Sequence, residues 1–132
     1  MCIRDSAWLD PERPPASAAR ALLERGPAVV LLTRGARGAT VVTAAGDAPI
    51  APVVTEVVDT IGAGDAFGGG FVAWWVSHGL GREDLARQER VVDAARFAAV
   101  VAARTVACAG ASPPQVPAQA AGRPLDVSEL SG

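Results

Sequence analysis

Near the middle of the sequence lies the stretch Val57-Val58-Asp59-Thr60-Ile61-Gly62-Ala63-Gly64-Asp65-Ala66-Phe67. Its first residues are typical of an extended strand and its glycines of a turn, and the apolar spacing that follows predicts a helix over residues 62–79. The first amide N–H groups of a helix have no partner within it, and the helix dipole adds partial positive charge there. The stretch therefore predicts a helix start at which an anion can bind.

Asp65 stands in the first turn of that expected helix. The dipole favours a negative charge there, and a carboxylate beside a phosphate can accept the proton of an attacking hydroxyl group. Gly-x-Gly-Asp alone, however, favours a purely structural aspartate that stabilises the helix start. The following run Gly68-Gly69-Gly70 changes that balance. Each glycine costs roughly 1 kcal/mol relative to alanine, so the run indicates close approach by a packed neighbour or a ligand.

The sequence on either side predicts an α/β layer. The expected elements, in chain order, are a helix (14–25), a strand (28–32), a turn (34–38), a strand (39–43), a hairpin at Gly46-Asp47, an extended segment (53–58), the helix described above, a short charged helix or loop (82–89) and an alanine-rich helix (91–106). The apolar run 28–32 is expected to be buried on both faces, as in a parallel sheet. Pro49 and Pro52 place the strand after the hairpin at an edge or make it irregular.

The composition excludes several classes of protein. The chain has 132 residues, which suits one domain or part of a larger one, and it is 50% hydrophobic and 20% charged, as in a globular protein. A net charge of −2 gives no case for binding nucleic acid or an anionic membrane. Two cysteines and one histidine cannot build a disulfide framework or a zinc site. The expected compartment is the cytoplasm.

Residues 59–67, Asp-Thr-Ile-Gly-Ala-Gly-Asp-Ala-Phe, resemble the second signature of PfkB/ribokinase-family carbohydrate kinases, Asp-Thr-x-Gly-Ala-Gly-Asp-x-Phe. The resemblance implies a partial ribokinase-like α/β fold, with a parallel-rich sheet flanked by helices and a β-hairpin. It implies Asp65 as catalytic base and the amides of Gly62, Ala63 and Gly64 as an anion hole. It also implies that Asp59, with the backbone of Ile61, helps to bind a monovalent cation such as K⁺. A turn-forming role at the strand end explains Asp59 equally well.

Two flanking segments extend the resemblance to nearly the whole chain. Residues 33–39, Thr-Arg-Gly-Ala-Arg-Gly-Ala, are similar to the family's Thr-Leu-Gly-x-x-Gly turn, with an arginine in place of the usual leucine. The loop at 109–114 resembles the family's carboxy-terminal Gly-Ala loop. Ala98 stands where many relatives carry asparagine or histidine near adenine, which argues against a polar adenine contact. The nucleotide-binding residues that the resemblance implies are Thr33, Gly35, Gly38, Ala98 and Gly110.

The implied activity is ATP-dependent phosphorylation of a sugar hydroxymethyl group, with Mg²⁺ accompanying ATP and with fructokinase-like members most similar. The family's amino-terminal half, with its sugar-binding residues and sheet lid, has no counterpart here. Residues 1–6 are expected to be a non-native leader, and residues 7–132 the carboxy-terminal nucleotide-binding part. We therefore expect the chain alone to be inactive and marginally stable or prone to aggregate, because a sheet without its first strands exposes an edge. A non-catalytic nucleotide-binding or regulatory module is the alternative, and a homodimer is compatible with the full-length form.

Overall fold

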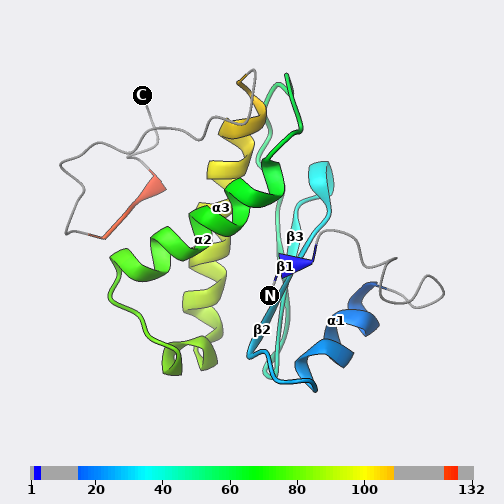
Figure 1. The fold of residues 1–132 in the computed structure, drawn as a ribbon, viewed down its shortest axis with the longest axis vertical. Helices are drawn as coiled ribbons and strands as arrows, with labels where there is room; N and C mark the ends of the chain where they lie inside the picture. Colours follow the sequence, from blue (N-terminus) through cyan, green and yellow to red (C-terminus); the bar gives the residue numbers. More distant parts are fainter. Residues whose placement is uncertain (1, 4–14, 109–123, 128–132) are drawn as a thin grey trace.

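The computed structural model describes residues 2–3, 15–108 and 124–127. A sheet lies between one helix on one face and a pair of crossing helices on the other (Figure 1). The strands are β1 (Cys2–Ile3), β2 (Val29–Thr33), β3 (Ala39–Thr43) and β4 (Gly46–Ile50), in that spatial order. The helices are α1 (Pro15–Leu23), α2 (Ala63–Ser77) and α3 (Gln88–Val106), with short 3₁₀ helices η2 (Gly35–Arg37) and η3 (Glu83–Ala86).

The α/β class is confirmed, but the described part of the sheet is mainly antiparallel. β2 pairs antiparallel with β3, from Val29 opposite Thr43 to Thr33 opposite Ala39, and β3 pairs antiparallel with β4. Only the two-residue β1, which lies in the segment expected to be a leader, runs parallel to β2. The expectation of a parallel-rich sheet is therefore wrong for these residues. The reason is that short turns join β2 to β3 and β3 to β4, whereas a parallel pair needs a long crossover.

The strand β2 is buried on both faces, as its apolar run predicts. Val29 and Leu31 pack in the core that α2 and α3 share with the sheet. Val30, between them, packs against Ala19 and Leu22 of α1. Alternate residues of a strand point to opposite faces, so an unbroken apolar run is needed when helices cover both sides.

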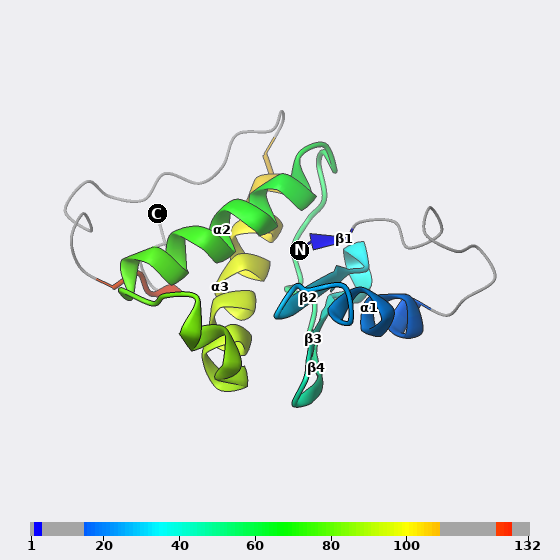
Figure 2. The ribbon, with the colours of Figure 1, turned by 60° about the horizontal axis from the view of Figure 1, so that its bottom comes forward.

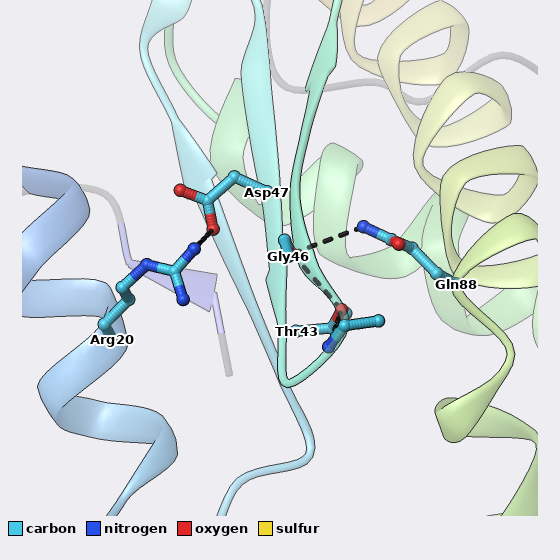
Figure 3. Close-up of polar contacts among 6 residues, drawn as sticks. Arg20, Thr43, Gly46, Asp47 and Gln88 are labelled. Atoms are coloured by element: carbon cyan, nitrogen blue, oxygen red, sulfur yellow. Dashed lines mark hydrogen bonds and ion pairs between the residues drawn. The ribbon is translucent and has the colours of Figure 1, made fainter.

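The tip of the β3–β4 hairpin is tied to helices on both faces of the sheet (Figure 3). The turn lies at residues 44–45, two positions before the expected Gly46-Asp47, which begin β4 instead. Arg20 of α1 donates to Asp47 at 2.9 Å, and the Gln88 side chain of α3 donates to the Gly46 carbonyl at 3.2 Å. β4 is an edge strand of the described sheet, as Pro49 predicts.

Residues 53–58 were expected to be extended, but they pair with no strand in the described part of the chain. Instead, the N–H groups of Val58 and Asp59 both donate to the carbonyl of Val106, at 2.7 and 3.1 Å. These bonds satisfy a free carbonyl at the end of α3. They also hold the segment that leads into α2 beside the carboxyl end of α3.

α2 and α3 cross at close range (Figure 2). A Cβ added at Gly70 would lie 3.1 Å from the Val101 side chain and 3.2 Å from the Cα of Ala98. Gly70 therefore has the packed neighbour that the glycine run predicts. A Cβ at Gly68 or Gly69 would meet nothing within 4 Å, so helix packing explains only the last glycine of the run.

Candidate active site

An open groove of about 1190 Å³ lies between the sheet and the α2–α3 pair. Its walls come from the end of β2, the η2 turn, the start of β3, residues 52–57, the start of α2, the carboxyl half of α3 and the start of α1. Small-molecule sites typically occupy about 300–1,000 Å³, so the groove has room for a nucleotide-sized ligand.

The groove brings together the two motifs that the sequence singles out. Thr33, Gly35 and Gly38 line it from the turn after β2, and Ala63 and Gly64 line it from the start of α2. These segments lie about 25 residues apart in the sequence. Their convergence depends on the fold, because the turn sits at the sheet while α2 is held by the end of α3.

The start of α2 leaves backbone donors available. Gly62 is the N-cap with φ 80°, a left-handed conformation that glycine adopts without steric cost. The first firm helical bond runs from Ala66 N–H to the Gly62 carbonyl at 2.8 Å, while Ala63 N–H is 3.4 Å from the Thr60 carbonyl. Among the described residues, the amides of Gly64 and Asp65 have no hydrogen-bond partner. An anion at this position would meet unpaired N–H groups.

Asp65 is exposed in the first turn of α2, directly after the groove-lining Gly64. Within the described part of the chain, its carboxylate forms no ion pair or hydrogen bond. Asp65 itself is not part of the groove wall. The side chain is therefore unengaged, one residue after the groove-lining Gly64.

Asp59 and Ile61 form a local turn. One carboxylate oxygen of Asp59 accepts a hydrogen bond from the Ile61 N–H at 2.9 Å. This hydrogen bond stabilises the turn, so it accounts for an aspartate at position 59 without a bound cation. No group of three or more His, Cys, Asp or Glu residues within the described ranges could hold a metal ion. A cation bound here would depend mainly on the second Asp59 oxygen and on backbone carbonyl groups.

Ala98 does not reach the groove. It is fully buried against Gly70 of α2, and the wall that α3 contributes is formed by Ala99, Ala102, Ala103 and Val106. One residue turns an α-helix by about 100°, so Ala98 faces α2 when Ala99 faces the groove. The spacing of these wall residues is helical, but alanine and valine carry no chemical signal by which sequence reasoning could find them. Gly110 lies outside the described residues.

Comparison with known proteins places the chain in a family. Residues 7–119 match the model of the pfkB family carbohydrate kinases, and the chain belongs to that family. No curated protein matches the chain. Within the described ranges, no helix is both long and apolar enough to cross a membrane.

Solved structures of carbohydrate and nucleoside kinases are similar to the chain. The fructokinase from Vibrio cholerae O395, with fructose, ADP and calcium ion bound, is 25% identical over 80% of this chain, with a TM-score of 0.68. The ribokinase from Giardia lamblia is 25% identical over 98%, with a TM-score of 0.69. The aminoimidazole riboside kinase from Salmonella enterica, complexed with aminoimidazole riboside and an ATP analog, is 25% identical over 95%, with a TM-score of 0.67. The chain spans 33%, 41% and 37% of these proteins, respectively.

Proposed function

We propose that this chain is the nucleotide-binding part of a kinase that transfers a phosphoryl group from ATP to a sugar hydroxymethyl group. The observation that carries the proposal is the groove in which the turn after β2 meets the start of α2, with the unpaired Asp65 in that first helical turn. Family membership supports a carbohydrate substrate. The fructokinase neighbour, solved with fructose and ADP, supports a sugar of that class.

The proposed chemistry divides between backbone and side chain. The amides of Gly62, Ala63 and Gly64 hold the transferring phosphoryl group and stabilise the charge on its oxygens. Asp65 takes the proton of the sugar hydroxyl group. At the same time the hydroxyl oxygen bonds to the γ-phosphorus of ATP, and the bond between that phosphorus and the oxygen that stays with ADP breaks. Thr33, Gly35 and Gly38 position the nucleotide.

The proposed reaction uses Mg²⁺ bound to ATP and a monovalent cation. No carboxylate lines the groove within the described residues, so Mg²⁺ would be held chiefly by the phosphates, whose charge it neutralises. A fructokinase neighbour is solved with a potassium ion, which supports a monovalent cation near Asp59 and Ile61. The proposed compartment is the cytoplasm, and a homodimer at full length stays a prediction.

For the 132-residue chain by itself, we propose nucleotide binding without turnover. The chain spans only 33% of the fructokinase neighbour, and a sugar must be bound before its hydroxyl can be phosphorylated. The test is a titration of the chain with ATP, followed by a coupled assay for ADP formation with fructose or ribose. Sugar-dependent turnover by the chain alone would contradict this proposal.

The role of Asp65 is tested by replacing it with asparagine in a chimera in which this chain substitutes for the matched third of the Vibrio fructokinase. Loss of a general base typically lowers kcat by about 10²- to 10⁴-fold, and we expect a loss in that range with ATP affinity unchanged. The control is Asp93→Asn, a half-exposed carboxylate of α3 that pairs with Arg96 at 3.6 Å and is not part of the groove wall. A D65N chimera with near-parental kcat would contradict the assignment.

A further inference from the structure

The charges that line the groove are all positive. Arg34 and Arg37 are its only charged lining residues, and no aspartate or glutamate lines it in the part of the chain that the structure describes. Both arginines are exposed, and neither pairs with a carboxylate among the described residues. A groove lined by two unpaired guanidinium groups and by no carboxylate among the described residues attracts an anionic ligand.

The backbone fixes both arginines on one closed turn. The Arg34 N–H donates to the Gly38 carbonyl at 2.8 Å, and the Arg37 N–H donates to the Arg34 carbonyl at 3.2 Å. The two side chains therefore start from a preorganised loop at the end of β2. A guanidinium group binds phosphate oxygens through two parallel N–H bonds, so this turn suits a chain of phosphates.

On the α3 side of the groove, the described side chains cannot tell one nucleobase from another. Its α3 side consists of alanine and valine side chains, and valines from residues 53–57 face the same space. Apart from the arginines, the polar lining side chains are Thr33, Thr55 and Thr60. A threonine hydroxyl can both donate and accept a hydrogen bond. It therefore fits the amino group of adenine and the keto group of guanine equally well.

We propose that this groove selects its nucleotide by the polyphosphate chain, through Arg34 and Arg37, and accepts purine bases without regard to their polar edge. The inference rests on the proposed function and adds the class of phosphoryl donor, purine nucleoside triphosphates in general. Apolar walls contribute affinity for any flat ring, because the burial of apolar surface is not directional. Discrimination between bases needs hydrogen-bonding groups that would be left unpaired by the wrong base, and the described lining side chains supply for this only threonine hydroxyls, which can pair with either base.

The test is calorimetric titration of the full 132-residue chain with ATP, GTP and ITP at low salt. We expect the three Kd values to agree within about threefold, because the lining lacks groups that discriminate by leaving a partner unpaired. AMP should bind at least about tenfold more weakly, and inorganic tripolyphosphate should compete with ATP. Both effects should shrink as salt is added, since exposed charges are screened.

The variants Arg34→Gln and Arg37→Gln test whether these two side chains bind the polyphosphate. Each should weaken ATP binding by about five- to tenfold and leave AMP binding less affected, as expected for the loss of a charge-assisted contact. The matched control is Arg25→Gln, an exposed arginine without an ion pair among the described residues, placed at the opposite end of β2. Circular dichroism of each variant verifies that it is folded.

The possible failures are distinguishable. If the folded chain binds no nucleotide and no tripolyphosphate, the proposed function and this inference both fall. If ATP binds but GTP is more than tenfold weaker, or if both arginine variants keep the parental Kd for ATP, nucleotide binding stands and the inference is overturned.

Discussion

At the scale of single residues, Gly38 has a structural requirement independent of any ligand. Its φ is +85°, and a Cβ at this position would lie 2.3 Å from the Ile50 carbonyl oxygen. The turn after β2 and the end of β4 thus touch through backbone atoms. Gly35 has φ +56° but open space around it, so only its conformation favours glycine. The two glycines of the Gly-x-x-Gly turn therefore meet different requirements. Gly35 is favoured by its positive φ alone, whereas Gly38 is favoured by its positive φ and by the close approach of the β4 backbone.

We expect Gly38→Ala to destabilise the chain by about 3 kcal/mol or more, since left-handed strain of roughly 1–2 kcal/mol adds to a backbone clash. Gly35→Ala should cost only the strain, about 1–2 kcal/mol. Urea unfolding of both variants, with tryptophan fluorescence as the signal, measures the difference. Equal losses in the two variants would show that the contact with Ile50 does not matter.

At the scale of the element, α2 is unusual because it is apolar on nearly all sides. Phe67, Trp74 and Trp75 are buried against α3 and the sheet, yet Val72 and Val76 are 60% and 68% exposed on the outer side. A helix that is apolar all round is normally buried all round. In the described structure, α2 is covered on one side only, and the glycines at 68 and 69 leave its surface bare.

The three glycines of α2 should respond differently to alanine. Gly69→Ala meets no atom within 4 Å, so it should stabilise the chain by about 0.5–1 kcal/mol through helix propensity. Gly70→Ala would press on the Cα of Ala98 at 3.2 Å, and overpacking of about 1–3 kcal/mol should outweigh that gain. Thermal unfolding of both variants, with Gly68→Ala as a second open position, gives the comparison. A stabilising Gly70→Ala would mean that α2 and α3 separate freely.

At the scale of the whole molecule, apolar surface gathers on the side of α2 and the segment that precedes it. The exposed large hydrophobic residues there are Val53, Val54, Val57, Val58, Ile61, Val72 and Val76. Exposed apolar side chains in this number favour association. The arrangement agrees with the expectation, made from the sequence, that the isolated chain is prone to aggregate, which stays a prediction.

We expect the chain to associate as its concentration rises, because the outer side of α2 offers apolar surface to a second molecule. The double variant Val72→Lys with Val76→Lys should shift sedimentation-velocity profiles toward the monomer without changing the circular dichroism spectrum. Ser17→Lys, on the exposed side of α1, adds charge elsewhere and should leave association unchanged. A parental chain that is monomeric at every concentration and melts sharply at high temperature would contradict this expectation.

Much of the local structure follows from the sequence because it depends on neighbouring residues. The helices α1, α2 and α3, the strands β2 and β3, the burial of β2 on both faces and the turn–helix order around Asp65 follow from apolar periodicity and glycine placement. The turn formers Gly46 and Asp47 predict the hairpin turn two residues too late, because the strand register puts it at Ala44 and Ala45.

Other features were decided only by tertiary contacts. The sequence could not show that the sheet is mainly antiparallel, that residues 53–58 bond to the end of α3, or that Ala99 rather than Ala98 faces the groove. The spacing of apolar residues indicates which side of a helix or strand is apolar. The segment that covers that side, however, is set by packing between distant parts of the chain. The amino-acid sequence by itself predicted the glycine turn at the start of α2 and the carboxylate of Asp65 in the helical turn that follows it. The tertiary structure alone decided that two arginines and a wall of small apolar side chains stand around the same space, because only folding brings residues 34–37, 63–64 and 99–106 together.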